Sequence, residues 1–199
     1  MKNKTIEFYN KNAKKWEERV LATDNSYRLK IIKKFKKIIQ NGKIIELGCG
    51  TGLDAILLTK NGYEYYGIDA SKELLKIAKN NFSEGIFSQM DFEKILFQNS
   101  YFDGFWASAS LLHLPKNKIK KVLVKIKKIC KPGSTGFISL KIGEGEEFDK
   151  KTGLFFAYYQ KGEIQKILEE CGFKIIRIET TKDTLNRSNH DWIWIFLNT

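Results

Sequence analysis

The stretch Glu46-Leu47-Gly48-Cys49-Gly50-Thr51-Gly52 decides the fold of this chain. It follows a short apolar run, Lys43–Leu47, that is typical of a buried strand, and it precedes the apolar positions of a helix that begins near Leu53. Glycines let the backbone turn tightly and approach a ligand without a Cβ clash. A glycine-rich turn between a strand and a helix therefore predicts a ligand site at the carboxyl end of that strand.

Outward from this turn, strands and helices alternate along the chain. The pattern predicts strands at 43–47, 63–68, 86–90, 102–107, 135–140, 173–179 and 191–197. Helices alternate with most of these strands, and none falls between the last two. Alternation predicts right-handed crossovers and a mostly parallel sheet with helices on both faces, whereas the last pair should be antiparallel. Because Trp192–Phe196 is apolar on both faces, we expect this strand inside the sheet.

Two absent phosphate-binding motifs and the position of Asp69 narrow the type of ligand. Leu53 stands where a dinucleotide fingerprint needs a third glycine, and the Gly-Lys-Ser/Thr of a phosphate-binding loop is absent. Asp69 ends the second strand, 21 residues after Gly48. A carboxylate at this place can accept hydrogen bonds from both hydroxyls of a ribose. The spacing favours a nucleoside ligand without a pyrophosphate.

At this point the sequence resembles the class I S-adenosylmethionine (SAM)-dependent methyltransferases over nearly its whole length. It is most similar to stand-alone bacterial methyltransferase-domain proteins of the tellurite-resistance and small-molecule type. The segments that carry the resemblance are Glu46–Gly52, Tyr66–Ser71, Gln89–Phe92, Phe102–Pro115 and Lys131–Ser134. It implies a Rossmann-like sheet with strand order 3-2-1-4-5-7-6 and an antiparallel last strand. It also implies one domain over 1–199, with a helical lid at 1–42, a SAM-binding core at 43–141 and a substrate-side part at 142–199.

The same resemblance implies a set of cofactor-binding residues. They are Tyr9, Trp16, Glu46, Gly48, Cys49, Gly50, Asp69, Ala70, Met90, Asp91, Phe92 and Ala107. Asp69 would hold the ribose, and Asp91 would contact the adenine amine, with Met90 or Phe92 packed on the ring. Tyr9 and Trp16 would cover the cofactor from the lid, or they are ordinary core aromatics of the first helix. The cofactor would be SAM and the product S-adenosylhomocysteine (SAH).

The acceptor side is less constrained by the sequence. Methyl transfer from a sulfonium releases a neutral group, so positioning of the acceptor can supply most of the rate, and no metal is expected. His113 is the candidate general base, and the alternative is a residue that lines the pocket. The candidate acceptor-pocket residues are Trp106, Ser108, Lys141, Phe156, Tyr159 and Arg187. The aromatic segment 155–159 could instead pack its loop onto the core.

Charge suggests a second possible partner. The chain carries a net charge of +12, and residues 1–45 and 115–141 each hold a net +9. Such segments could bind RNA, or they could be solvated helix faces. No aromatic side chains alternate with the lysines, so nucleic acid is not favoured. The Asn/Asp-Pro-Pro-aromatic motif of base-amino methyltransferases is missing, and so is the Pro-Cys pair of cytosine-C5 enzymes.

Composition sets the remaining expectations. Cys49, Cys130 and Cys171 are scattered, which indicates a reducing cytoplasm rather than a disulfide framework, and no apolar run is long enough to span a membrane. We expect a methyltransferase that acts on a small molecule through an oxygen, nitrogen or sulfur nucleophile. The alternatives are an RNA or protein methyltransferase and a non-catalytic SAM-binding accessory domain. The acceptor and the oligomeric state stay open.

Overall fold

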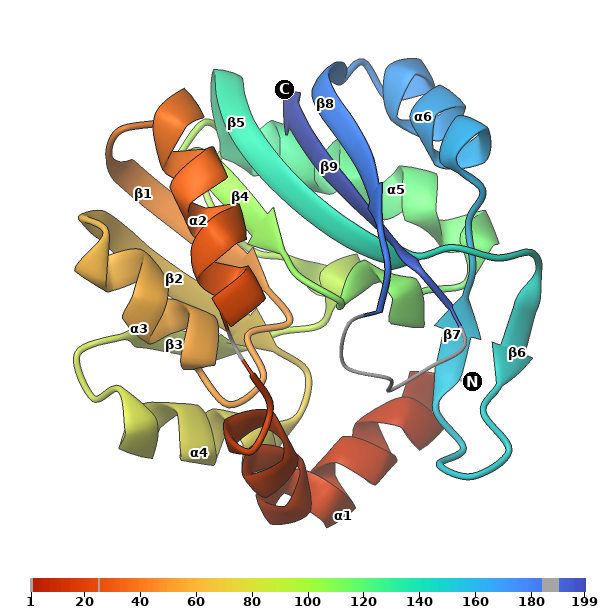
Figure 1. Cartoon of the computed structure of the whole chain (residues 1–199). Helices are drawn as coiled ribbons and strands as arrows, with labels where there is room; N and C mark the ends of the chain where they lie inside the picture. The colour runs from red at the N-terminus through yellow and green to blue at the C-terminus, as the bar shows by residue number, and fades with distance from the viewer. Residues whose placement is uncertain (1, 25, 184–189) are drawn as a thin grey trace.

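The fold is organised around a seven-stranded sheet in the order β3-β2-β1-β4-β5-β9-β8 (Figure 1). The structure is a computed structural model that describes residues 2–24, 26–183 and 190–199. Its strands are β1 (Gly42–Leu47), β2 (Tyr63–Asp69), β3 (Ile86–Gln89), β4 (Phe102–Ala107), β5 (Cys130–Lys141), β6 (Glu146–Phe148), β7 (Phe155–Ala157), β8 (Lys174–Thr181) and β9 (Trp192–Asn198). Its helices are α1 (Lys2–Leu21), α2 (Ser26–Ile38), α3 (Leu53–Lys60), α4 (Lys72–Asn81), α5 (Lys116–Ile129) and α6 (Lys161–Glu170), with 3₁₀ turns η1 (Phe92–Lys94) and η2 (Leu111–His113).

The pairing of the strands confirms the predicted topology. β1 pairs in parallel with β2 and β4, β2 with β3, and β4 with β5. β9 lies between β5 and β8 and is antiparallel to both. The position of β9 explains its composition: Ile193 and Ile195 are buried on one face of the sheet, and Phe196 is buried on the other.

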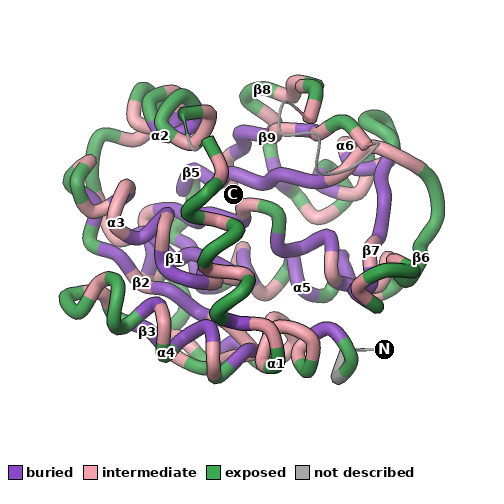
Figure 2. Tube along the Cα trace, turned by 60° about the horizontal axis from the view of Figure 1, so that its bottom comes forward, coloured by how far each residue is buried: buried purple, intermediate pink, exposed green. Residues whose placement is uncertain are grey.

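Helices cover both faces of the sheet and form two hydrophobic cores. On one face α5 and α6 bury residues such as Val122 and Ile164 against the strands. On the other face α2, α3 and α4 bury residues such as Phe35, Leu58 and Leu75. Figure 2 shows the result, with buried residues along the strands and exposed residues on the outer sides of the helices.

Local sequence signals set most boundaries. The Ser71 hydroxyl accepts a hydrogen bond from the Leu74 N–H and so caps α4, as predicted. One boundary differs from the prediction. We expected a turn at residues 131–133 before a strand that begins at Thr135, but β5 begins at Cys130, directly after α5. Cys130 already pairs with Phe102, and a register shift in the β4–β5 pairing accommodates the intervening residues.

A short hairpin was not predicted from the sequence. β6 and β7 pair antiparallel through Glu147 and Phe156, and β7 lies in the aromatic segment 155–159. Each strand has only three residues, which is too short for a period of two to be visible. Within the described ranges, no helix is long and apolar enough to cross a membrane.

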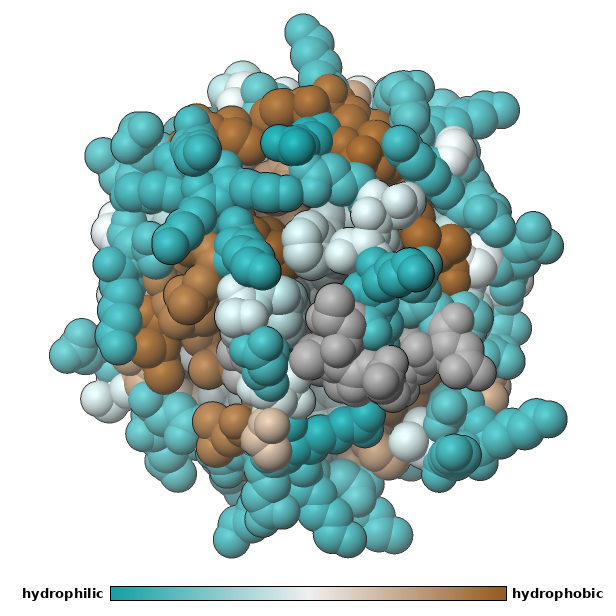
Figure 3. Space-filling view, viewed as in Figure 1, coloured by the Kyte–Doolittle hydropathy of each residue, from teal (hydrophilic) through white to brown (hydrophobic). Residues whose placement is uncertain are grey.

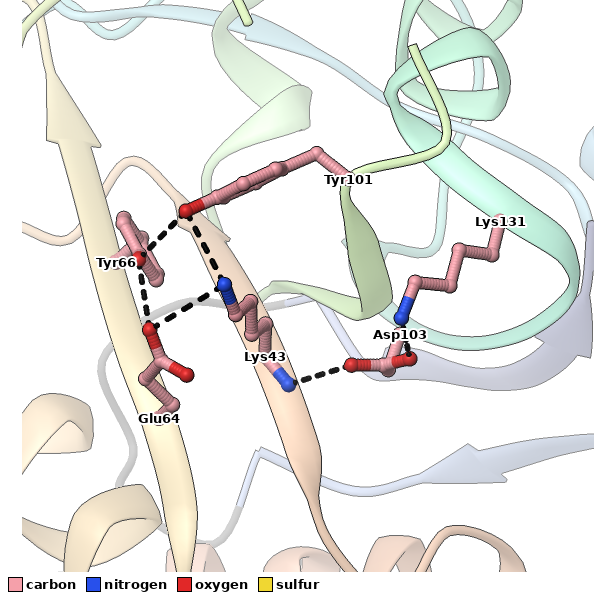
Figure 4. A network of polar contacts seen from close by, with 6 residues as sticks. All are labelled: Lys43, Glu64, Tyr66, Tyr101, Asp103 and Lys131. Atoms are coloured by element: carbon pink, nitrogen blue, oxygen red, sulfur yellow. Dashed lines mark hydrogen bonds and ion pairs between the residues drawn. The ribbon is translucent and has the colours of Figure 1, made fainter. Parts of the chain in front are cut away.

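The amino-terminal ends of the strands are tied together by polar side chains (Figure 4). Asp103 of β4 accepts hydrogen bonds from the Lys43 backbone N–H at 2.9 Å and from Lys131 Nζ at 2.6 Å. Next to it, the Tyr66 hydroxyl donates to Glu64 Oε1 at 2.7 Å and lies 2.9 Å from the Tyr101 hydroxyl. These contacts join β1, β2, β4 and β5 at the end of the sheet opposite the glycine-rich turn.

Candidate active site

A cavity of about 1110 Å³ lies at the carboxyl-terminal ends of the parallel strands. Its walls come from the segments that follow β1, β2, β4 and β5, from α1 and α2, from the β6–β7 hairpin and from β9. Around it, hydrophilic side chains cover most of the face seen in Figure 3, with apolar patches between them. This is the end of an open α/β sheet at which ligands bind.

The glycine-rich turn forms one wall of the cavity. The N–H groups of Gly48 and Cys49 donate to the carbonyl oxygen of Ile68 at 2.8 and 3.0 Å, which holds the turn against the end of β2. Gly48 has a φ of +78°, and a Cβ at this position would lie 2.5 Å from Ser110 Cβ. Only glycine fits there, because both the backbone conformation and the close approach exclude a side chain.

Asp69 lies beside the turn at the end of β2. Its Oδ2 accepts the Gly50 N–H at 2.9 Å, and its Oδ1 accepts the Ser71 N–H at 2.8 Å. Burial raises the pKa of this carboxyl, and contacts with the backbone N–H groups of Ser71, Gly50 and Ala70 oppose that rise. A carboxylate has about four acceptor positions, so an Asp69 carboxylate can still accept hydrogen bonds from a ligand in the cavity.

A buried polar network supports the turn from behind. Asp54, at the start of α3, accepts Arg28 Nη1 at 2.6 Å and the Trp106 indole N–H at 2.9 Å. Glu46 accepts a hydrogen bond from the Tyr65 hydroxyl. Burial, together with the nearby charge of Asp54, raises the pKa of the Glu46 carboxyl well above its ordinary value. These groups link α2, β1, β2, α3 and β4 beneath the cavity.

At the end of β3 the cavity is lined by Asp91 and Phe92. The Asp91 carboxylate accepts the Glu93 N–H at 2.8 Å and caps η1, which fixes its orientation. Ser110 lies between this corner and the turn, since a Cβ on Gly48 would meet both Ser110 and Phe92. The Ser110 hydroxyl oxygen is buried and has no hydrogen-bond partner among the described residues, although Ser110 lines the cavity.

Helix α1 lies along one side of the cavity and contacts its wall at two places, the start of α4 and His113. At one end the Asn10 side-chain oxygen accepts from Ser71 Oγ at 2.8 Å and from the Glu73 N–H at 3.2 Å, so α1 helps to cap α4. At the other end the Tyr9 hydroxyl lies 3.0 Å from His113 Nε2. Tyr9 also packs edge-on against Trp16, with ring centroids 5.2 Å apart.

The contacts of His113 define its protonation. Its Nδ1 lies 2.7 Å from the carbonyl oxygen of Phe155, which can only accept, so Nδ1 carries the proton. Nε2 is therefore the acceptor, and the Tyr9 hydroxyl donates to it. Burial, assisted by the positive charge of Lys141, lowers the pKa of His113 to about 4, although the Phe155 contact opposes this shift. The imidazole is neutral near pH 7.

Aromatic rings continue around the cavity wall beyond His113. The His113 and Phe156 ring centroids are 5.0 Å apart, those of Phe156 and Tyr158 are 6.2 Å apart, and Tyr158 stacks on His190 at 4.2 Å. Lys141, at the end of β5, places Nζ 4.0 Å from the centre of the Phe156 ring. All of these residues line the cavity. We name the rings of Trp16, Tyr9, His113, Phe156, Tyr158 and His190 the aromatic arc.

Comparisons with known proteins agree with this geometry. Residues 44–133 match the family model of a methyltransferase domain. Residues 44–133 of this chain therefore carry a methyltransferase domain. The match covers the turn, Asp69, Asp91 and His113, and the solved proteins that share the fold include SAM-dependent methyltransferases.

Relatives of this methyltransferase domain differ in how much they share with it. Malonyl-[acyl-carrier protein] O-methyltransferase of Buchnera aphidicola is 29% identical over 64% of this chain, which spans 51% of that protein. The ubiquinone biosynthesis O-methyltransferase of Pelagibacter ubique is 27% identical over 95% of this chain and 76% of its own length. The 1,6-didemethyltoxoflavin-N1-methyltransferase of Burkholderia thailandensis, solved with its substrate and SAH, covers 99% of this chain and 88% of its own. Its TM-score of 0.80 at 12% identity confirms the fold.

Most residues predicted to bind the cofactor line the methyltransferase cavity. They are Tyr9, Trp16, Glu46, Gly48, Cys49, Gly50, Asp69, Ala70, Asp91 and Phe92. Ala107 does not line it, because it points into the core and is fully buried, and Met90 packs against the same core. The structure thus corrects the prediction for Ala107 and Met90.

Only some of the residues predicted for the acceptor side line the cavity. Ser108, Lys141, Phe156 and the candidate base His113 line the cavity. Trp106 does not, because its ring packs between Phe35 and Phe137. Tyr159 is also buried in the core, and its hydroxyl has no partner among the described residues. Arg187 lies outside the described residues.

Sequence reasoning missed several lining residues. Trp192, Trp194 and His190 line the cavity. Trp192 and Trp194 alternate with buried Ile193 and Ile195, so a period of two could have assigned them to the face opposite the isoleucines. Across residues 2–24, 26–183 and 190–199, no group of three or more His, Cys, Asp or Glu side chains is placed to hold a metal ion.

Proposed function

We propose that this protein transfers the methyl group of SAM to a small-molecule acceptor through an oxygen, nitrogen or sulfur nucleophile. The observation that carries the proposal is the division of one cavity into two parts. The glycine-rich turn, Asp69 and Asp91 form a part suited to a nucleoside, and the aromatic arc forms a second part beside β4 and β5. The names of the relatives, which concern a carrier-bound malonyl group, ubiquinone and a toxoflavin precursor, also support a small acceptor.

The residues of the first part fit the cofactor. The remaining acceptor positions of Asp69 would bind the ribose hydroxyls, the backbone of 48–50 would approach the methionine end, and Asp91 with Phe92 would hold the adenine. The unpartnered Ser110 hydroxyl fits a bound ligand, because an unsatisfied buried hydroxyl costs about 1–3 kcal/mol. Tyr9 and Trp16 of α1 would cover the cofactor, which makes 1–42 the lid of the domain.

Methyl transfer from SAM requires the protein mainly to position the acceptor. SAM supplies an electrophilic methyl group on a sulfonium, and its departure leaves a neutral thioether. The side chains around the second part bind the acceptor, hold it in line with the methyl group and exclude water. Placement alone can contribute several kcal/mol to the acceleration, provided that the acceptor lies at near-attack distance.

His113 is better suited to positioning than to proton abstraction in this arrangement. A general base works best when its pKa is near the operating pH, whereas burial holds the pKa of His113 near 4. Its Nε2 is also engaged by the Tyr9 hydroxyl. We therefore assign His113 to the pocket, where it joins the lid to the carbonyl oxygen of Phe155.

The basic helices offer little support for an RNA substrate. On α5, Lys116 pairs with Glu163 at 2.7 Å, Lys118 with Glu93 at 2.9 Å, and Lys120 with Glu170 at 2.5 Å. Lysines that neutralise carboxylates of their own chain have less to gain from a phosphate backbone. The free cysteines fit the reducing cytoplasm in which we propose that the protein works.

Calorimetric titration tests the cofactor part of the proposal. We expect the wild-type protein to bind SAM and SAH but not NAD, and Asp69→Ala to lose most of the SAH affinity. Asp149→Asn is the matched control, because Asp149 lines the same cavity from the hairpin turn, where its Oδ1 accepts the Thr152 N–H at 2.7 Å. An Asp69→Ala protein that binds SAH as tightly as the control would contradict the proposal.

A further inference from the structure

The second part of the cavity has a chemical character of its own. Its aromatic arc is continuous, with each ring centroid within 6.2 Å of the next from Trp16 to His190. Trp192 and Trp194 of β9 extend the aromatic wall. Aromatic faces provide a large apolar surface with defined stacking geometry, so such a wall favours a planar ligand over a puckered one.

Lys141 places a positive charge at a defined point of this part. Lys141 is half-buried at the end of β5, and its ammonium lies over the Phe156 ring in the middle of the arc. Two rings of the arc at its lid end, Tyr9 and His113, carry no charge near pH 7, because burial raises the pKa of Tyr9 and lowers that of His113.

Carboxylates on the hairpin already have hydrogen-bond donors. Glu147 Oε1 accepts the Tyr158 hydroxyl at 2.7 Å. Asp149 Oδ1 accepts three donors from its own turn, the Lys151 N–H and the Thr152 N–H and hydroxyl. These hydrogen bonds, assisted by the positive charge of Lys141, hold the pKa of Asp149 below its ordinary value although burial opposes this shift. A ligand anion over Phe156 would meet a cation with an aromatic floor beneath it, a geometry that favours a flat anion.

We propose that the acceptor is a planar, conjugated molecule that carries an anionic oxygen, which Lys141 binds while Phe156 and Tyr158 pack against the ring system. The proposal rests on the proposed methyltransferase function and names its substrate class. The sheet order supports the placement, since β4 and β5 lie next to β1 on the side away from the ribose site at β2. An acceptor over Phe156 would thus lie beyond the methionine end of the cofactor.

Three probes of equal size separate shape from charge. They are 4-hydroxybenzoate, which is planar and anionic, 4-hydroxybenzamide, which is planar and neutral, and trans-4-hydroxycyclohexanecarboxylate, which is anionic and puckered. Each is titrated calorimetrically into the protein saturated with SAH. We expect 4-hydroxybenzoate to bind about tenfold more tightly than either of the other two, a difference of about 1.4 kcal/mol.

Variants assign the two contributions to residues. Lys141→Met should weaken 4-hydroxybenzoate about tenfold and leave 4-hydroxybenzamide unchanged, whereas Phe156→Leu should reduce the preference for the planar over the puckered anion. Lys150→Met is the matched control, because Lys150 lines the same cavity from the exposed hairpin turn. SAH affinity is measured for every variant and should stay within twofold of the wild type.

The outcomes separate this inference from the function on which it rests. Equal affinities for the three probes, equal effects of Lys141→Met and Lys150→Met, or no binding of 4-hydroxybenzoate at millimolar concentration would overturn the substrate class while SAH still binds. Failure of the wild-type protein to bind SAH would overturn the proposed function itself.

Discussion

Polar side chains are paired with one another at one end of the parallel strands and face a cavity at the other end. At the amino-terminal ends, Lys43, Glu64, Asp103 and Lys131 contact one another or nearby tyrosines (Figure 4). At the carboxyl-terminal ends, Asp69 contacts only backbone N–H groups in the described residues, and the Ser110 hydroxyl has no partner there. The chain satisfies its own polar groups at one end and presents them to a cavity at the other.

The causes of the pKa shifts also differ between the two ends of the strands. At the amino-terminal ends pairing outweighs burial: the pKa of Lys43 is raised by Tyr101 and Glu64, and that of Asp103 is lowered by Lys131 and Lys43 in spite of its partial burial. At the carboxyl-terminal ends burial dominates, and it raises the pKa of Glu46 and lowers that of His113. Contacts at the amino-terminal ends stabilise the charged forms of these side chains. Burial at the carboxyl-terminal ends disfavours the charged forms in the absence of a ligand.

The largest expected effect comes from the network beneath the cavity. Asp54→Ala removes the buried carboxylate that pairs with Arg28 and accepts the Trp106 indole N–H, so we expect the free energy of unfolding to fall by about 3–5 kcal/mol. Urea denaturation measures it. Lys76→Ala is the control, since Lys76 pairs with Glu73 on an exposed helix face and should cost less than about 1 kcal/mol. Similar losses for both variants would show that the network is not special.

A substitution in the glycine-rich turn should weaken the binding of SAH. Gly48→Ala places a Cβ against Ser110 in a left-handed conformation, and we expect SAH affinity to fall more than tenfold, or about 1.4 kcal/mol. Gly145→Ala is the control: its φ of +73° is as strained, but no heavy atom lies within 4 Å of the added Cβ. Calorimetry with SAH compares the two. A Gly145→Ala protein with the same loss would mean that strain anywhere in the chain weakens binding.

The cavity end should also be sensitive to acid through His113. Its pKa is about 4 in the folded protein and near 6.5 when unfolded, so the unfolded state takes up the proton first as the pH falls through this window. Stability attributable to the neutral imidazole is complete above pH 6.5 and is lost toward pH 4. We expect His113→Gln, which keeps a donor toward Phe155 and an acceptor toward Tyr9, to lose about 1 kcal/mol less than the wild type between pH 7 and pH 5. Parallel pH profiles from urea titrations would contradict this.

The smallest expected effect lies at the amino-terminal ends. Asp103→Ala removes a partly exposed ion pair with Lys131 and one backbone hydrogen bond to Lys43, which together should cost about 0.5–1 kcal/mol. SAH affinity should stay unchanged, because the network is at the far end of the sheet from the turn. Loss of SAH binding in this variant would show that the two ends are coupled.

The sequence signals for the first part of the cavity are local. The glycine-rich turn, Asp69 and the Ser71 cap each depend on a few neighbouring residues, and the strand order follows from alternation and the family resemblance. The antiparallel pairing of β9 with β8 was predictable because no helix separates the two strands, and its place inside the sheet was predictable because Trp192–Phe196 is apolar on both faces. Such patterns depend on burial and backbone conformation, which a short stretch of sequence encodes.

The acceptor side was harder because it is assembled from distant segments. The arc joins α1, η2, the hairpin and residue 190, and no periodicity relates these parts of the chain. Trp106 illustrates the difficulty: it ends a strand beside the cavity, but Asp54 accepts its indole N–H on the opposite face of the sheet. The face on which an aromatic lies at a strand end depends on the pleat, and a shift of one residue reverses it.

The place of β9 has a consequence for how the protein is made. β8 reaches the rest of the sheet only through β9, which follows it in the chain and pairs with β5 on its other side. While the ribosome is still adding residues 192–198, β8 has no partner strand, and β5 presents an open row of N–H and C=O groups. The glycine-rich turn and its strands can form early in synthesis, whereas this edge of the sheet must wait. A nascent chain paused before Trp192 should therefore be the form most prone to recruit chaperones or to aggregate.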